Sequence, residues 1–156
     1  MATLHLICGL PCAGKTTLAR QLEDTLPALR LTPDEWHLPL YGQDAEEEAH
    51  DARHSLIEAM LWGVASRVLA LGVNVILDFG FWAKSERDDY RARAAALGAD
   101  SEVHFPDVSL EELKARLKLR NDPLSQTTFF IPEENLIAWS ALFEPPERDE
   151  LKRRKG

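Results

Sequence analysis

Short apolar runs alternate with longer amphipathic stretches along this chain. Four of the apolar runs have the length of strands: residues 4–8, 28–31, 73–78 and 102–105. Three stretches between them have the spacing of helices: residues 16–26, 43–71 and 85–97. Strands that alternate with helices are typical of βαβ units, so the pattern predicts an α/β fold with a parallel sheet.

The longest of these helices carries one apolar stripe. Its expected members recur every fourth residue or lie beside that row: Leu56, Ile57, Met60, Leu61, Val64 and Val68. Gly72 follows as a C-terminal cap. We therefore expect this stripe to cover the sheet.

Capping residues mark the remaining helices. Thr32 precedes a proline and predicts the N-cap of a short helix. Ser109 and Glu112 form a capping box for a helix at residues 109–119. Residues 121–131 are polar and irregular, which indicates a loop, and a last helix follows to residue 143.

The segment from Gly9 to Thr16 fits the pattern G-x-x-x-x-G-K-[ST] at every position. A strand precedes it and a helix follows, which is the context of a phosphate-binding loop (P-loop), whereas a glycine-rich turn with an incidental lysine is the alternative. The glycines turn backbone N–H groups inward, and the helix N-terminus favours anions. Lys15 would reach the β- and γ-phosphates of ATP, and Thr16 would bind Mg²⁺. The expected nucleotide contacts are Gly9, Pro11, Cys12, Ala13, Gly14, Lys15, Thr16 and Thr17.

Two carboxylates follow predicted strands. Asp34 comes just after the second strand, and Asp78 ends the strand at 73–78. Ligands of open α/β sheets bind at the carboxyl ends of the strands. We therefore expect Asp34 to act as a general base toward an acceptor hydroxyl and Asp78 to hold Mg²⁺ as in a Walker B segment. The alternative for Asp34 is a helix-start acid that only favours the dipole.

Arg116 and Arg120 lie four residues apart, on one face of a helix that precedes the 121–131 loop. Such arginines could close over ATP from a lid and neutralise charge on the transferring phosphoryl group, with Arg116 also contacting the nucleotide. Solvated helix arginines are the alternative.

Other side chains leave more than one interpretation open. Six lie just beyond the two aspartates and could form either an acceptor pocket or ordinary core: Trp36, His37, Tyr41, Phe79, Phe81 and Trp82. His50 and His54 resemble a helical metal pair, but without a third ligand a solvated or pocket-lining face is favoured. Three arginines could contact an anionic substrate or could be surface charge: Arg53, Arg87 and Arg91.

Composition narrows the class of partner. A net charge of −8, from 26 acidic and 18 basic residues, argues against nucleic-acid and membrane-surface binding. The two cysteines, Cys8 and Cys12, are too few and too close for a disulfide framework, which favours the cytoplasm. No run is long enough to span a bilayer, and no signal peptide is evident.

The chain resembles the small AAA-like P-loop kinases, which include polynucleotide kinase, zeta toxin and chloramphenicol phosphotransferase relatives. The resemblance rests on the segments GLPCAGKTT, TPDEW, VILDFGFW, RLKLRN and FEPP. It implies a P-loop NTPase fold with sheet order 2-3-1-4, helices on both faces and a short lid. It also implies a general base at Asp34, a strand-end acid at Asp78 and lid arginines at Arg116 and Arg120. Relatives often add a fifth strand after the last helix, near the adenine, but residues 144–156 are almost wholly polar here.

Together these features predict a kinase domain at residues 1–146 and a charged C-terminal tail at 147–156. The expected activity is transfer of the γ-phosphoryl group of ATP, with Mg²⁺, to a hydroxyl of a small molecule such as an antibiotic, a sugar or a nucleotide-like compound. The alternatives are a nucleotide-dependent switch or ATPase and a 5′-end nucleic-acid kinase. A monomer or a homodimer is expected, and the sequence leaves the acceptor and the choice between ATP and GTP open.

Overall fold

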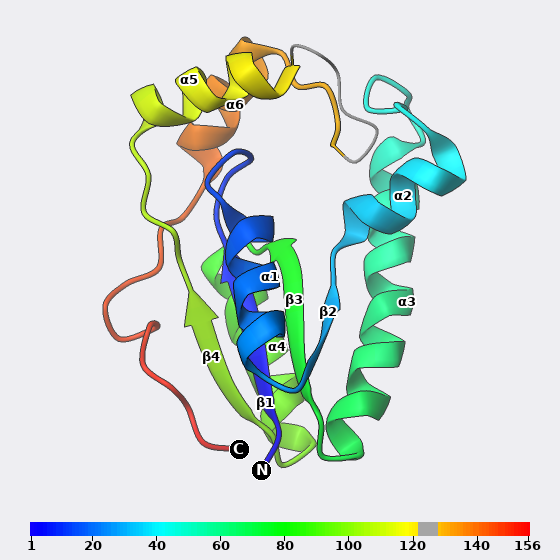
Figure 1. Cartoon of the computed structure of the whole chain (residues 1–156), viewed down its shortest axis with the longest axis vertical. Coiled ribbons are helices and arrows are strands. Elements are labelled where there is room, and N and C mark those ends of the chain that lie inside the picture. Colours follow the sequence, from blue (N-terminus) through cyan, green and yellow to red (C-terminus); the bar gives the residue numbers. More distant parts are fainter. Residues whose placement is uncertain (122–127) are drawn as a thin grey trace.

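The structure, a computed structural model, describes residues 1–121 and 128–156. Its centre is a four-stranded parallel sheet (Figure 1). The strands lie in the order β2 (Ala28–Leu31), β3 (Asn74–Gly80), β1 (Thr3–Cys8) and β4 (Asp100–His104). The α/β class and the order 2-3-1-4 are thereby confirmed.

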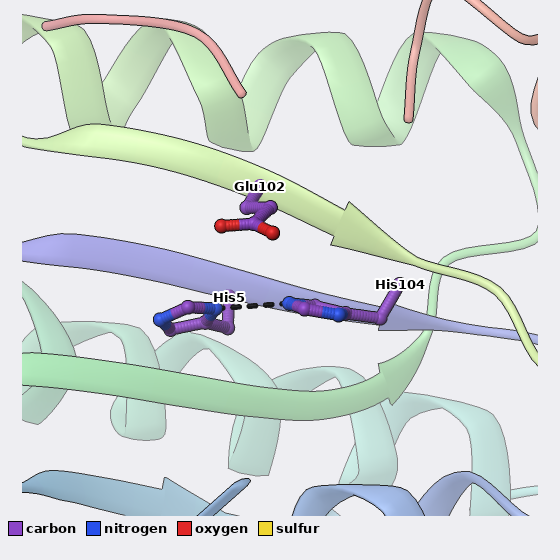
Figure 2. A group of neighbouring side chains, drawn as sticks. All are labelled: His5, Glu102 and His104. Carbon is purple, nitrogen blue, oxygen red and sulfur yellow. Dashed lines mark hydrogen bonds between the residues drawn. The ribbon is translucent and has the colours of Figure 1, made fainter. Parts of the chain in front are cut away.

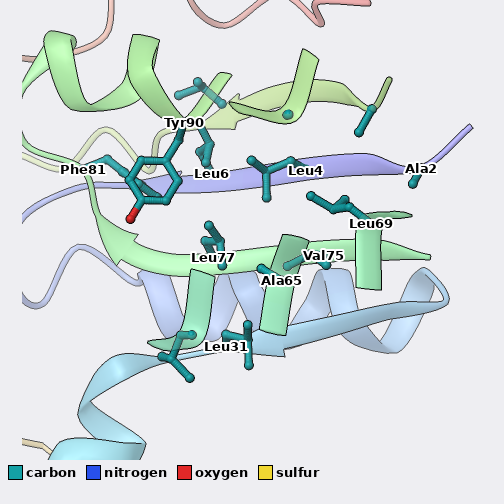
Figure 3. Packing of buried hydrophobic residues seen from close by; sticks show 14 of the residues in the cluster. Ala2, Leu4, Leu6, Leu31, Ala65, Leu69, Val75, Leu77, Phe81 and Tyr90 are labelled. Carbon is teal, nitrogen blue, oxygen red and sulfur yellow. The ribbon is translucent and has the colours of Figure 1, made fainter. Parts of the chain in front are cut away.

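Helices cover both faces of the sheet. On one face, α1 (Lys15–Thr25) packs over Ile7 and Ile76. On the other, α3 (His50–Ala70) and α4 (Lys84–Ala96) enclose the main core with Leu4, Leu6 and Leu77 (Figure 3). Alternate residues of β1 therefore face opposite helical layers, and all six of its residues are buried.

A second apolar cluster joins the remaining helices to the P-loop. Leu113 and Leu117 of α5 (Leu110–Asn121) and Leu136 of α6 (Glu133–Leu142) pack with Leu10 and Ala13. These two helices therefore lie across the P-loop end of the molecule, opposite α2 (Pro33–Tyr41) and the start of α3 (Figure 1).

The long helix differs from its prediction at both its start and its buried face. It begins at His50 rather than at residue 43, because Gly42 has a φ of 70° and Asp44 is buried against later residues of the helix. The buried row is Ile57, Leu61, Ala65 and Leu69. Ile57 and Leu61 of the predicted stripe are thus confirmed as buried and Val68 is half-buried, whereas the predicted row of Leu56, Met60 and Val64 is exposed.

The C-terminal segment packs along the protein instead of remaining solvated throughout. Glu150 is buried and accepts a hydrogen bond from Nε of Arg87 at 2.8 Å. Arg91 donates to the carbonyl oxygen of Lys152 at 2.7 Å, and Ser101 pairs with Arg154 in an isolated antiparallel bridge. Arg87 and Arg91 are therefore structural, and the hypothesis that they contact an anionic substrate was wrong.

Within the described residues the sheet has four strands, and no fifth strand follows α6. The bridge between Ser101 and Arg154 lies beside β4, at the sheet edge. It supplies a short stretch of pairing at this edge of the sheet.

Candidate active site at the phosphate-binding loop

The P-loop runs from Gly9 to Gly14, between the end of β1 and the start of α1. Its entry is fixed by a hydrogen bond from the Gly9 N–H to the Gly80 carbonyl oxygen, at 2.9 Å. Gly14 has a φ of 89°, a left-handed conformation that glycine adopts without steric cost, and it forms the N-cap of α1. The first N–H groups of α1 therefore point into the loop, as an anion site requires.

A cavity of about 830 Å³ opens beside this loop. Most predicted site residues line it: Pro11, Cys12, Gly14, Lys15, Thr16, Thr17, Asp34, Asp78, Arg116 and Arg120. Gly9 and Ala13 do not line it. Gly9 is bonded to β3, and Ala13 packs under α5 and α6 in the apolar cluster. The fold therefore gathers residues that are more than a hundred positions apart around one space.

Asp78 is the best-enclosed polar group of the cavity wall. It lies on β3 with 5% of its surface exposed, and its Oδ2 accepts hydrogen bonds from the hydroxyls of Thr16 at 2.7 Å and Thr32 at 3.0 Å. Its other oxygen, Oδ1, is buried without a hydrogen-bond partner among the described residues. An unpartnered carboxylate oxygen beside a threonine hydroxyl fits a hard cation such as Mg²⁺, which prefers oxygen ligands.

Thr32 has a different function from the one predicted. It is the N-cap residue of α2, but its side chain makes no capping hydrogen bond. Its hydroxyl accepts a hydrogen bond from Arg30 at 2.7 Å and donates to Asp78. The sequence indicated a cap, whereas the sheet order places Thr32 next to β3 and so makes it a support for Asp78.

Lys15 is folded back against the P-loop, where its Nζ donates to the carbonyl oxygen of Leu10 at 3.1 Å. Burial lowers the pKa of Lys15, although the carboxylates of Asp78 and Asp34 act in the opposite direction. A lysine with so little solvation favours an anionic ligand nearby, which the phosphates of a nucleotide would supply.

Asp34 lies in the first turn of α2, half-buried in the cavity wall. Its charge acts on both Lys15 and His54, so it stands between the P-loop and the start of α3. It makes no salt bridge among the described residues. A carboxylate in this position is free to accept a proton from a ligand held in the cavity.

The two arginines of α5 contact the P-loop from the side opposite α2. Arg116 Nη1 donates to the Cys12 carbonyl oxygen at 3.2 Å, and Arg120 contacts the Cys12 sulfur. Nε of Arg120 is buried without a partner in the described part of the chain. The lid was expected over residues 121–131, of which 122–127 lie outside the described residues.

The aromatic residues separate into two groups. Phe79, Phe81 and Trp82 line the cavity, whereas Trp36 and Tyr41 are exposed outside it. Phe81 is buried with a φ of 46°, a conformation that is strained for a residue with a side chain and that is concentrated at functional sites. The pocket interpretation therefore fits the residues after β3 and does not fit those of α2.

The histidine pair of α3 belongs to a hydrogen-bonded network. Asp44 is bonded through Oδ1 to His37 and His50, both at 2.7 Å, and through Oδ2 to Arg53 at 2.9 Å. The ligand atoms of His37, Asp44 and His50 lie within metal-binding range of one another. However, the Arg53 guanidinium already neutralises Asp44, so the network favours a structural function over a metal. It also shows that Arg53 binds Asp44 and Glu47 rather than a ligand in the cavity.

A second group with metal-ligand character lies outside the cavity. His5 of β1 and His104 of β4 face each other with Nδ1 and Nε2 2.9 Å apart, and Glu102 lies beside them (Figure 2). Two imidazoles and a carboxylate suit a divalent transition metal. Because these residues do not line the cavity, they are not part of the candidate active site.

Several cavity residues carry no motif that sequence reasoning could have detected. Glu58 is one turn after His54 on α3, Glu86 lies in the first turn of α4, and Phe129 follows the loop after α5. Only the i, i+4 spacing of His54 and Glu58 could have indicated their shared helical face.

Comparisons with known proteins agree with this geometry. A family model described as an AAA domain matches residues 4–146. No curated protein matches the chain. In the part of the chain that the structure describes, no helix has the length and apolar character of a membrane span.

Three solved structures share the fold. A chain of the Pnkp1/Rnl/Hen1 RNA repair complex is 23% identical with a TM-score of 0.72, over 90% of this chain and 43% of that chain. Kti12 from Chaetomium thermophilum, in complex with ADP-AlF3, is 23% identical with a TM-score of 0.73, over 92% and 81%. A gluconokinase from Sinorhizobium meliloti 1021 is 18% identical with a TM-score of 0.68, over 96% and 79%.

These identities establish a common fold. The chain spans less than half the length of the RNA repair chain that it matches. The presence of an RNA repair complex among these structures gives no support to the expectation that nucleic acid is an unlikely partner. Because the family model covers nearly the whole chain, the protein belongs to this AAA domain family, in agreement with the resemblance of its sequence to the small AAA-like P-loop proteins.

Proposed function

We propose that the protein is a kinase that transfers the γ-phosphoryl group of ATP to a hydroxyl of a small molecule. The observation that carries this proposal is the position of Asp34. It is a carboxylate without a salt bridge among the described residues, in the wall of the cavity that contains the P-loop lysine. A protein that only binds and slowly hydrolyses nucleotide has no need of an acceptor base at this place.

Each part of the reaction has a candidate residue. Lys15 and the N-terminal amides of α1 would hold the phosphates, and Arg116 and Arg120 would neutralise charge on the group in transfer. Asp34 would take the proton of the acceptor hydroxyl while the hydroxyl oxygen bonds to the γ-phosphorus. The bond from the γ-phosphorus to the bridging β-phosphate oxygen would break at the same time, and ADP would leave.

Thr16 and Asp78 would hold Mg²⁺. When bound, this ion neutralises charge on the phosphate oxygens. The fit rests on Asp78, whose Oδ1 is buried without a partner in the described residues while Oδ2 is held by two threonine hydroxyls.

A 5′-end nucleic-acid kinase is the second candidate, and the fold shared with a chain of an RNA repair complex is the observation that favours it. It would catalyse the same transfer to a polynucleotide hydroxyl. The net charge of −8 counts against a long polyanion but leaves a short or locally held end open.

Asp34→Asn tests the kinase proposal because it keeps the shape of the side chain and removes the base. We expect transfer to an acceptor to fall by about 10²–10⁴-fold, with ATP affinity nearly unchanged. Affinity is measured by calorimetry and transfer by product formation on the same preparation. Transfer within about threefold of wild type, far below the general-base range, would remove Asp34 from the mechanism.

A further inference from the structure

Charge is unevenly distributed around the cavity. Lys15, Arg116 and Arg120 gather at the P-loop, where the phosphates would bind. The wall beyond Asp34, formed by the starts of α3 and α4, carries Glu58 and Glu86 instead. One end of the cavity is therefore suited to a polyanion and the other is not.

The acidic wall is continuous from Asp34 to α4. His54 Nε2 lies 3.3 Å from Glu58 Oε1, and its neighbour Asp34 acts on the same imidazole. Burial alone would lower the pKa of His54, but the pKa is raised because Glu58 bonds to it and Asp34 and Asp51 add negative charge. Burial, with a contribution from Glu58, raises the pKa of Glu86 to about 7. Glu58 therefore adds negative charge beside both His54 and Glu86.

No lysine or arginine pairs with either glutamate among the described residues. In the described part of the chain, Glu86 has no salt bridge and Glu58 pairs only with His54. The guanidinium of Arg87 is directed away, toward Glu150 and the Phe81 carbonyl oxygen. The fourth basic residue of the lining, Arg20, is exposed and bonded to Glu35. Residues 122–127 contain no lysine or arginine.

Aromatic residues line the same cavity. Phe79 lies at the end of β3, and Phe81 and Trp82 come directly after the strand. The ring centroids of Phe79 and Phe81 are 5.4 Å apart. The faces of such rings attract cations, most strongly where water is excluded. Carboxylates and aromatic rings together form the environment in which proteins bind organic ammonium groups.

We propose that the phosphoryl acceptor is a hydroxyl compound that also carries a protonated amine, with the ammonium group held by Glu58 and Glu86 and the hydroxyl directed at Asp34. This inference rests on the proposed kinase function. The site is the cavity itself, whose buried Asp78 Oδ1 already marks it as prepared for a ligand. Acceptors that carry a carboxylate or phosphate would meet repulsion at this wall.

Three matched sets of acceptors test the inference. They are amino sugars, amino alcohols and aminoglycosides; their N-acetylated or deaminated neutral counterparts; and sugar acids together with a 5′-hydroxyl oligonucleotide. With labelled MgATP, we expect kcat/KM for the best amine to exceed that of its N-acetylated form by at least about tenfold, the worth of one retained ion pair. Transfer confined to neutral or anionic acceptors would overturn the inference and leave the kinase proposal standing. No transfer to any set would overturn the kinase proposal, and the inference with it.

Two variants locate the amine. Glu58→Gln and Glu86→Gln should each raise KM for the amine acceptor about tenfold and reduce its preference over the N-acetylated form, with KM for ATP unchanged. Glu134→Gln is the matched control, because Glu134 is an exposed glutamate of α6 outside the cavity lining. Unchanged KM values in both wall variants would show that the amine is bound elsewhere and would overturn the assignment.

Discussion

At the residue scale, the candidate site depends on buried polar atoms. Some are hydrogen-bonded to other side chains, and others have no partner among the described residues and could bind a ligand. Asp78 shows both conditions, since one oxygen is held by Thr16 and Thr32 and the other has no partner among the described residues. Burying a charged group is costly unless hydrogen bonds or a cation compensate it. The unpartnered oxygen therefore lowers the stability of the ligand-free protein and favours the binding of a cation.

Lys15→Ala should reduce transfer by about 10²–10³-fold, the usual cost of removing one charge-stabilising donor. The fold should be retained because Nζ makes a single hydrogen bond among the described residues, to the carbonyl oxygen of Leu10. Turnover with MgATP and the thermal midpoint are the two measurements. Near-normal turnover would contradict the P-loop assignment, whereas a large fall in the midpoint would show that Lys15 is structural.

At the element scale, α4 supports the cavity wall through residues that face away from the cavity. Arg87 of α4 donates to the Phe81 carbonyl oxygen at 2.8 Å, and Phe81 has a strained φ of 46°. The same guanidinium binds buried Glu150. Thus one side chain ties the turn after β3 to the C-terminal segment.

Arg87→Met should lower the free energy of unfolding by about 3–5 kcal/mol, because it leaves Glu150 as a buried charge without its partner. Lys84→Met is the control, since Lys84 and Asp88 form an exposed pair whose loss should leave the free energy of unfolding nearly unchanged. Urea unfolding measures both. The double variant Arg87→Met with Glu150→Gln should recover part of the lost free energy of unfolding. Equal losses in Arg87→Met and Lys84→Met would show that Arg87 does not link the turn after β3 to the C-terminal segment.

At the scale of the whole molecule, buried histidines make stability depend on pH. Burial lowers the pKa of His5 to about 4, with His104 as the second cause, and burial also lowers the pKa of His37 and His104. A lowered folded-state pKa means that the unfolded chain binds more protons below pH 6.5. These three histidines should therefore make the free energy of unfolding fall from pH 6.5 toward pH 4, whereas Glu86, whose pKa is raised to about 7 by burial, acts in the opposite direction as the pH falls below 7.

His5→Gln should reduce this acid loss, and His54→Gln is the opposite control. The pKa of His54 is raised, so its contribution is fully present below pH 6.5 and is lost as the pH rises through the folded-state value. Urea unfolding at half-unit steps from pH 4 to pH 8 distinguishes them. Parallel curves for wild type and His5→Gln would show that His5 does not titrate with unfolding.

Local pattern determined much of this molecule. The P-loop, the strands that carry Asp78 and precede Asp34, and the parallel α/β class follow from residues that are neighbours in the chain, because motif spacing and hydrophobic periodicity are local properties. Resemblance to a family added the sheet order.

What only the tertiary structure decided involves residues far apart in the chain. The start of α3 depends on Asp44 being buried between α2 and α3, and its buried face depends on where the sheet lies. The support of Asp78 by Thr32 and the acidic wall of Glu58 and Glu86 depend likewise on which elements the fold brings together. Burial and pairing are properties of the assembled fold, so local spacing alone could not have predicted them.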